Sequence, residues 1–319
     1  MTTLEPRTAR STAGTAQQQR HLGRGLGWAV LSAASFGLSG PLAKSLLEIG
    51  WTPGAVVLVR VAGAFALLLV PCLVLLRGMA RPSAAAVRRM LTYGVVAVAL
   101  AQLCYFNAVS HLSVGVALLL EYLAPVLLIG WHWWRSKKRP ARSVFLGAAI
   151  AMGGMVLVLD VARGVTLNPV GVLWGLAAAA CLCVFFVLSD DSGSGESIPP
   201  MLMTTVGTGV GAAVLVAAGA VGFVPMAFAS GRTSLAGLAV AWWVPIALLI
   251  VVTAAVAYLM GIAAIRHLGS GIASFVALSE VLFAVVFAAL LLGQLPTVAQ
   301  AVGGILVLAG IATVQRARR

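Results

Sequence analysis

The sequence predicts an all-α integral membrane protein with ten transmembrane helices in two inverted five-helix repeats. Three observations lead to this prediction: the composition, ten apolar runs and an internal similarity. Hydrophobic residues make up 61% of the 319 residues and charged residues only 9%, against about 25% charged residues in an average soluble domain. Ten spans of about 20 residues would use roughly 200 residues, so little of the chain is left for a soluble catalytic domain.

Each apolar run is close to the length that crosses the hydrocarbon core of a membrane as a helix. A helix is required because lipid cannot satisfy open backbone groups. The first run is longer than the apolar core of about 7–15 residues in a cleaved signal, so we expect a retained helix. The expected spans are 26–47, 55–76, 91–110, 113–134, 143–161, 169–189, 198–221, 242–265, 269–292 and 297–315.

The distribution of basic residues predicts the orientation. With the N-terminus inside, 17 Lys and Arg residues fall on the inner side and 3 on the outer side. The positive-inside rule therefore places both termini in the cytoplasm, and we expect a multi-pass protein of the bacterial cytoplasmic membrane. The same asymmetry accounts for the net charge of +13 without a nucleic-acid partner.

The chain resembles itself at two offsets. At an offset of 156, the matched pairs are His111-Leu112 with His267-Leu268, Pro140 with Pro296, Gly147 with Gly303 and Gly154 with Gly310. At an offset of 146, they are Gly25 with Gly171 and Trp28 with Trp174. Because five spans are an odd number, the two copies cross the membrane in opposite directions, as in many carriers, although a channel can share this architecture.

The repeat predicts four parts of the chain. Residues 1–24 are expected to be a disordered cytoplasmic tail, and residues 316–319 a basic cytoplasmic tail. The two five-helix repeats are expected at 25–165 and 166–315.

Two motifs connect the chain to a known family. The fourth span contains Ala-Leu-Leu-Leu-Glu-Tyr-Leu-Ala-Pro-Val at 117–126, and a second run extends through the ninth span from Ser-Glu-Val at 279–281 to Leu-Gly-Gln at 292–294. Over roughly 24–315 the chain resembles the EamA-type transporters of the drug/metabolite transporter (DMT) superfamily. The Glu-Tyr-Leu-Ala-Pro stretch is similar to the threonine/homoserine exporter subgroup. Two residues depart from the family pattern, since Gln294 stands in place of Glu and Val281 in place of Pro; the second departure predicts a straighter ninth helix.

The resemblance implies a function and an architecture. Helices 1, 3, 4, 6, 8 and 9 would surround a central cavity. A secondary active transporter would export small metabolites, such as amino acids or related amphipathic compounds, through this cavity by alternating access, with protons as a candidate coupling ion. A passive channel or facilitator of the same fold is the alternative, and an intramembrane enzyme a more remote one.

Glu121 and Glu280 are the acidic residues that lie deep within the expected spans. A charge in hydrocarbon is costly, and such residues usually face a bundle interior or an aqueous cavity. At the offset of 156, Glu121 falls on Ala277, three residues before Glu280, so both carboxylates lie on nearly the same helical face of their repeats. They are candidates for binding a substrate ammonium or carrying a proton; the other interpretation is a protonated, hydrogen-bonded structural carboxyl.

Other polar residues of the spans are further candidates for the pathway. A polar group inside the bilayer must find a partner, so helix–helix hydrogen bonding is the competing interpretation for each. Pro125 either exposes a backbone carbonyl to the cavity or makes a packing kink. The remaining candidates of this kind are Gln102, Tyr105, Asn107 and Tyr258.

Arg60 and two tryptophans complete the candidate set. Arg60 lies inside the second span, where it could snorkel to the outer surface, pair with Glu48 or hold a substrate carboxylate; we favour snorkelling or pairing. For Trp28 and Trp174 we favour interfacial anchoring over substrate stacking.

The sequence indicates neither an enzyme nor a cofactor. It contains no Walker loop and no His-Glu-x-x-His motif, so neither ATP hydrolysis nor a metal site is expected. The expected partners are a small-molecule substrate, protons and membrane lipid. The Gly207-x-x-x-Gly211 motif suits either close packing within the chain or a dimer face, which leaves a monomer and a homodimer both open.

Overall fold

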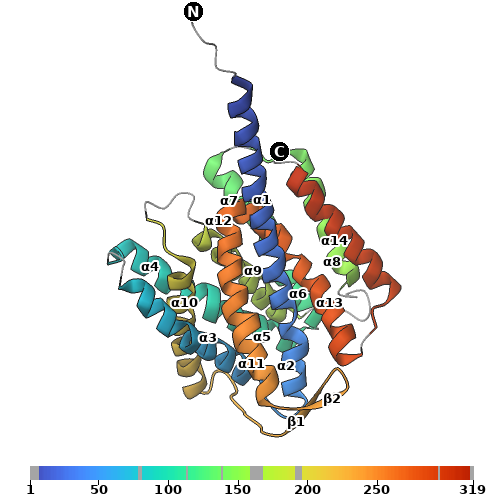
Figure 1. Ribbon diagram of the computed structural model, residues 1–319. Helices are drawn as coiled ribbons and strands as arrows, with labels where there is room; N and C mark the ends of the chain where they lie inside the picture. Colours follow the sequence, from blue (N-terminus) through green and yellow to red (C-terminus); the bar gives the residue numbers. More distant parts are fainter. Residues whose placement is uncertain are drawn as a thin grey trace, which may run out of the picture.

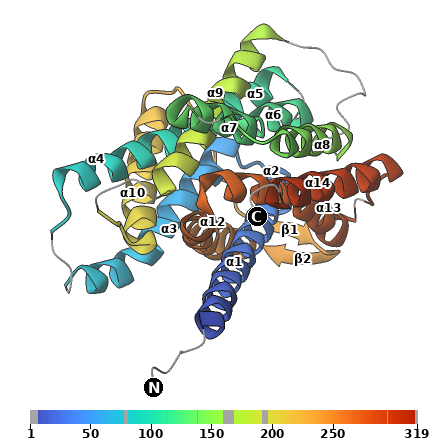
Figure 2. The ribbon, with the colours of Figure 1, turned by 90° about the horizontal axis from the view of Figure 1, so that it is seen from above.

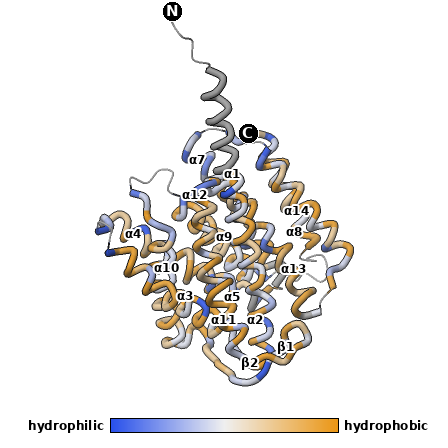
Figure 3. Tube along the Cα trace, in the orientation of Figure 1, coloured by the Kyte–Doolittle hydropathy of each residue, from blue (hydrophilic) through white to orange (hydrophobic). Residues whose placement is uncertain are grey.

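The computed structural model describes residues 7–77, 81–112, 114–137, 139–158, 168–190, 196–293 and 295–316. The helices form a bundle in which α1 begins and α14 ends at the same end, called here the termini end, while a β-hairpin marks the opposite hairpin end (Figure 1). Hydrophobic residues run along the helices, and hydrophilic stretches gather toward the two ends (Figure 3). This distribution is that of a bundle surrounded by lipid.

The fold class is confirmed as an all-helical membrane protein. Within the described residues, eight helical stretches are long and apolar enough to span a membrane, and α8 and α13 are shorter apolar helices. The helices are α1 (Arg7–Gly37), α2 (Ser39–Leu47), α3 (Pro53–Leu76), α4 (Ala84–Thr92), the π-helix η1 (Tyr93–Leu100), α5 (Ala101–His111), α6 (Val114–Glu121), α7 (Ala124–Ser136), α8 (Arg142–Val158), α9 (Pro169–Ser189), α10 (Pro200–Ala220), α11 (Trp243–Ile250), the π-helix η2 (Val251–Val256), α12 (Ala257–Ala277), α13 (Ser279–Leu292) and α14 (Val298–Arg316).

Some expected spans consist of consecutive helices. The first span is α1 with α2, the third α4 with η1 and α5, and the fourth α6 with α7. The turn between the eighth and ninth spans lies inside α12, at Gly269, whose φ of 75° and ψ of 157° are not helical. Helix α1 begins at Arg7, well before the predicted start at 26, because the Ala, Gln and Arg residues of this segment are good helix formers.

Both repeats interrupt the same helix at the same place. The fourth span breaks at 122–123, between α6 and α7, and the ninth breaks at Leu278, between α12 and α13; these positions are related by the offset of 156. Leu278 keeps helical dihedral angles, with φ of −57° and ψ of −24°, so the straighter ninth helix stays a prediction. The hydroxyl of Ser279 donates to the carbonyl of Val276 at 2.6 Å, and such side-chain bonds compete with the helix ladder even where no proline is present.

Helices α8 and α14 pack together through glycines that the repeat relates to one another. A methyl group at Gly147 would lie 2.8 Å from the carbonyl oxygen of Gly310, and one at Gly154 would lie 2.6 Å from that of Gly303. Gly147 corresponds to Gly303 and Gly154 to Gly310, so each contact is the symmetry mate of the other. The two helices lie side by side along one flank of the bundle in both views (Figures 1 and 2).

The first helix of each repeat packs against the other repeat. Gly25 of α1 contacts the side chains of His267 and Leu268. Its equivalent, Gly171 of α9, contacts His111 and Leu112. The two halves are thus interlocked around a pseudo-twofold axis, as an inverted repeat requires.

The Gly207-x-x-x-Gly211 motif serves packing within the chain. Gly207 lies against the ring of Tyr93, and Gly211 lies against Val98. Both contacts join α10 to η1, so these glycines let two helices of the bundle approach closely.

A β-hairpin that we did not predict crosses the hairpin end. Strand β1 (Arg232–Leu235) pairs antiparallel with β2 (Leu238–Ala241). The hydroxyl of Thr233 donates to the carbonyl of Ser45 at 2.5 Å, which ties the hairpin to α2. The backbone N–H of Ala236 donates to the carbonyl of Leu291 at 2.7 Å, which ties it to α13.

Candidate functional site

A cavity of about 770 Å³ lies between the two halves, within the range of about 300–1,000 Å³ that is common for small-molecule sites. Helices of the first, third, fourth, sixth, eighth and ninth spans line it, as the resemblance implied, and α3 contributes as well. The lining reaches the hairpin end, where Gly40, Lys44 and Leu47 are exposed. Toward the termini end it stops at buried residues such as Ala29 and Ala264.

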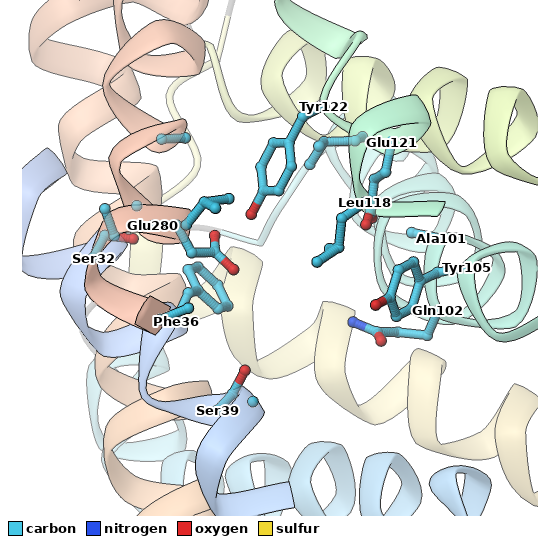
Figure 4. Close-up of a pocket in the computed structure, with 18 of the residues that line it drawn as sticks. Ser32, Phe36, Ser39, Ala101, Gln102, Tyr105, Leu118, Glu121, Tyr122 and Glu280 are labelled. Atoms are coloured by element: carbon cyan, nitrogen blue, oxygen red, sulfur yellow. The ribbon is translucent and has the colours of Figure 1, made fainter. Parts of the chain in front are cut away.

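Glu121 and Glu280 both line this cavity, each beside the break in its helix. Glu121 is the last residue of α6, and Glu280 lies in the first turn of α13. A helix start carries a partial positive charge that stabilises a nearby carboxylate. The two side chains enter the same space from different helices (Figure 4). The structure therefore brings together the two residues that the sequence singled out most clearly.

Polar side chains surround the two carboxylates. Gln102 and Tyr105 reach into the cavity from α5, on the side of Glu121 (Figure 4). The hydroxyl of Tyr122 points toward the Glu280 carboxylate (Figure 4). Tyr122 was not among our candidates, because in a continuous helix it would lie about 100° around the axis from Glu121.

An aromatic wall closes the space beside Glu280. The ring of Phe36 meets that of Tyr258 edge to face, with centroids 5.2 Å apart. Phe185 packs against the other side of this group, with its centroid 6.3 Å from that of Tyr258. All three residues line the cavity, so it offers apolar faces next to its charged groups.

Arg60 lies in the cavity wall rather than at the surface. Its side chain is 8% exposed, which contradicts the snorkelling that we favoured. Glu48 is exposed, and no ion pair joins it to Arg60 in the described part of the chain. The Nε atom of Arg60 is buried and has no hydrogen-bond partner among the described residues. Arg60 therefore lies among the charged groups of the cavity, with Glu121 and Glu280.

Of the remaining four candidates, one lines the cavity and three lie outside its lining. Pro125 lines the cavity at the start of α7, where its missing N–H costs no helix bond. Asn107 is outside the lining and donates to the carbonyl of Leu103 at 2.8 Å. Trp28 is 38% exposed and outside the lining. Trp174 packs behind Tyr105 with Ala101 and Cys104. The structure thus groups seven of our ten candidates around one space, namely Arg60, Gln102, Tyr105, Glu121, Pro125, Tyr258 and Glu280.

Hydrogen bonds join helices at the termini end, beyond the point where the cavity lining stops. The backbone N–H of Ser270 donates to Oδ2 of Asp190 at 2.9 Å, and its hydroxyl lies 3.0 Å from Nε2 of His132. Arg89 donates from Nε to the carbonyl of Leu188 at 2.7 Å and from Nη2 to that of Asp190 at 2.9 Å. These bonds join the third, fourth, sixth and ninth spans, and we refer to Arg89, His132, Asp190 and Ser270 as the closing network.

Two further contacts lie at the same end. Arg266 donates from Nη2 to the carbonyl of Ile198. The carboxylate of Glu196 accepts the backbone N–H of Ser83 at 3.3 Å. Ser83, Glu196 and Arg266 lie between the expected spans, and the sequence analysis did not anticipate that they would bridge helices.

The described residues contain no group of three or more metal-binding side chains. His111 and His267, which the repeat relates, each use Nδ1 to contact a backbone carbonyl four residues earlier, at 2.9 and 2.8 Å. The two histidines therefore have matching structural roles at the ends of their helices.

The fold and the cavity define a class: a multi-pass membrane protein with interlocked inverted repeats around one central space. The chain belongs to the EamA-like transporter family, whose model matches residues 23–160 and 169–315. The protein is therefore a membrane transporter rather than an enzyme, and it acts on a small-molecule substrate. The family model matches once in each half of the chain, in agreement with the repeat.

Other comparisons support the fold alone. One solved crystal structure, described only as that of a protein, aligns with a TM-score of 0.70 at 19% sequence identity. The alignment covers 91% of this chain and 98% of the other. A search of curated proteins found no match.

Proposed function

We propose that this transporter exports small amphipathic metabolites, amino acids among them, from the cytoplasm by alternating access. One observation carries the proposal: a cavity with two carboxylates at equivalent helix breaks reaches one end of the bundle, while hydrogen bonds close the other end. Discontinuous helices near the middle of an inverted repeat commonly form the substrate site of a carrier.

The closed termini end supports a carrier over a continuous pore. A channel needs a path that is open at both ends, whereas here the closing network joins four spans across one end. The 17-to-3 distribution of basic residues supports cytoplasmic termini. In that orientation the cavity faces outward, which corresponds to the state from which an exported substrate leaves.

Glu121 and Glu280 are the groups that we propose for substrate ammonium or proton binding. Buried ionisable side chains in transporters commonly mark substrate and proton pathways. We propose that their position beside the helix breaks couples their charge state to the angle between helix segments. We therefore propose exchange of a proton against the substrate, and the similarity of the 121–125 stretch to threonine and homoserine exporters makes these two amino acids the first to try.

Flux into proteoliposomes tests the proposal. Purified protein is reconstituted and given a panel of labelled amino acids, with and without a pH gradient. We expect the flux to saturate with substrate concentration and to respond to the pH gradient. We also expect unlabelled substrate on the opposite side of the membrane to accelerate it. Flux that never saturates and ignores both unlabelled substrate and the gradient would identify a passive channel instead.

A further inference from the structure

The turn between α7 and α8 presents a dense group of cations at the termini end. Residues 135–142 contain five Lys and Arg residues, and the chain has no acidic residue from 122 to 159. Helix α8 begins beside the end of α14, since a methyl group at Gly147 would meet the side chain of Val314. Four cations of the turn are described, and all four are exposed, namely Arg135, Lys137, Arg139 and Arg142.

Exposed aromatic rings lie directly beside these cations. The Lys137 ammonium lies 5.8 Å from the centroid of the Trp134 ring, which is 65% exposed. The ring of Trp133, near the end of α7, meets that of Phe145, in the first turn of α8, edge to face with centroids 6.5 Å apart. Tryptophan gathers at the headgroup level of a membrane. The rings therefore place the cations of the turn at the level of the lipid phosphates.

The second repeat contains the same turn without the charges. At the offset of 156, Lys137 corresponds to Gly293, and both residues end their helix in the left-handed conformation, with φ of 56° and 69°. Glycine adopts this conformation freely, whereas a lysine is strained in it. Membrane orientation requires basic residues on one side, but not a basic residue at a strained position. The other cations of the turn correspond to uncharged residues, namely Leu291, Leu295 and Val298.

We infer that the turn between α7 and α8, with its exposed aromatic rings, binds the headgroup of an anionic phospholipid. The Lys and Arg side chains donate charge-assisted hydrogen bonds to the phosphate, and the acyl chains lie along the exposed Phe145 and Leu146 of α8. Clusters of Lys and Arg directly beside a membrane helix commonly bind anionic lipids. The turn lies outside the cavity lining, so this inference depends neither on the substrate nor on the proposed transport.

Binding of a labelled lipid to the purified full-length protein tests the site. The protein in a neutral detergent receives phosphatidylglycerol with a dansyl group on one acyl chain, and energy transfer from tryptophan reports the bound lipid. Unlabelled phosphatidylglycerol, phosphatidylcholine and inorganic phosphate are then compared as competitors. For the wild-type protein we expect phosphatidylglycerol to compete about 10- to 100-fold better than phosphatidylcholine, because each Lys or Arg at an anionic surface contributes about 5-fold.

Lys137→Gly is the decisive variant, because it gives the turn the residue of its repeat equivalent. It should weaken phosphatidylglycerol binding about 5-fold, as for the loss of one charge. Its unfolding temperature without lipid should stay the same or rise, because glycine removes the strain at this position. In the double variant Arg139→Gln with Arg142→Gln the loss should be about 25-fold, as for two charges.

Arg77→Gln is the matched control. Arg77 is also an exposed cation, directly after α3, but α3 and α4 lie on the opposite flank of the bundle from α8 and α14 (Figure 2). Exposed charges farther apart than about 10 Å are largely screened by salt. This change should therefore leave phosphatidylglycerol binding almost unchanged.

Three results would overturn the inference. Equal competition by phosphatidylglycerol and phosphatidylcholine would show that the headgroup is not recognised. Equal losses in Lys137→Gly and Arg77→Gln would show a diffuse attraction to the whole basic end. Competition by inorganic phosphate as strong as that by the anionic lipid would assign a site for a free anion. If Lys137→Gly lowers the unfolding temperature, the double variant at 139 and 142 decides in its place.

Discussion

The backbone N–H of Ser270 donates a hydrogen bond to Oδ2 of Asp190 at 2.9 Å, across the closed end of the bundle. Asp190 follows α9, and Ser270 lies just after the turn at Gly269. At the offset of 146, Asp190 corresponds to Lys44, which lines the open end of the cavity. Equivalent positions thus lie at opposite ends of the bundle, one in a hydrogen bond across the closed end and the other in the lining of the open end, as expected when two similar halves adopt one of two opposite states.

Loss of this bond should favour opening of the termini end. In Asp190→Ala the charged acceptor is gone, and hydrogen bonds to charged groups contribute about 1.5–3 kcal/mol. A cysteine at Ala264, in a background without the native cysteines, should react up to about 10- to 100-fold faster with an impermeant thiol reagent added from the termini side.

Asp190→Asn is the control for this experiment, because its amide oxygen still accepts the Ser270 N–H. It should change the labelling rate less than Asp190→Ala. Equal labelling of the wild-type protein and both variants would mean that the bond does not hold this end closed.

Removal of either cavity carboxylate should weaken the response of transport to pH. In Glu121→Gln and Glu280→Gln the side chain keeps its size but no longer exchanges a proton, so we expect folded protein whose flux responds much less to an imposed pH gradient. Initial rates in proteoliposomes at several gradients provide the measurement.

Glu48→Gln is the matched control for the carboxylates. Glu48 is exposed at the end of α2 and lies outside the cavity lining, so this change should leave the response to pH intact. The same gradient dependence in all three variants and the wild-type protein would exclude Glu121 and Glu280 as the proton-carrying groups.

The contact between α8 and α14 should be sensitive to a single methyl group. In Gly154→Ala the new Cβ would lie 2.6 Å from both the carbonyl oxygen of Gly303 and the N atom of Val307. Overpacking of this kind costs about 1–3 kcal/mol, so the thermal unfolding temperature in detergent should fall.

The neighbouring glycine provides the comparison. A Cβ at Gly153 would have no heavy atom of another part of the chain within 4 Å, and alanine is favoured over glycine in a helix by about 0.5–1 kcal/mol. Gly153→Ala should therefore leave the unfolding temperature unchanged or raise it slightly. A fall of the same size in both variants would place the cost in the helix itself rather than in the contact.

The proposed orientation makes a prediction about the hairpin. A cysteine introduced at Ala236, at the turn between β1 and β2, should react with an impermeant thiol reagent added to intact cells. A reporter protein that is active only in the cytoplasm should be active when it is fused to the C-terminus. Reaction at Ala236 only after the cells are opened would reverse the orientation and make the open cavity face the cytoplasm.

Long apolar segments were the easiest part of the fold to predict, because the cost of exposing backbone to lipid forces a helix of known length. The expected spans leave residues 266–268 for the turn between the eighth and ninth helices, and the structure places it one residue later, at Gly269, whose φ is 75°. The hairpin was missed because its turn residues are Ala236 and Gly237, with φ of 53° and 74°. Alanine rarely adopts such a conformation, so the usual Asn-Gly or Asp-Gly signal is absent.

The residues of the site that could be predicted are those whose burial in a membrane span costs the most free energy. Glu121 and Glu280 stand out because a carboxylate in a membrane span demands an aqueous or polar surrounding. The location of Arg60 in the cavity wall depends on how α3 is rotated, which the nearly uniform apolar sequence of that helix does not reveal. Tyr122 and the closing network depend on helix breaks and loops, where hydrogen bonds distant in sequence decide the geometry.

The paired glycines of α8 and α14 have a consequence for the ancestry of the chain. Gly147 of α8 contacts Gly310 of α14, which is the repeat equivalent of Gly154, and Gly154 contacts Gly303, which is the repeat equivalent of Gly147. The contact surface is therefore complementary to itself. An unfused five-helix chain inserted in both orientations could make the same contact with a second copy of itself. Fusion of two copies would then allow each to change separately, so that one half could keep Glu121 and the other acquire Glu280 without losing the surface that holds them together.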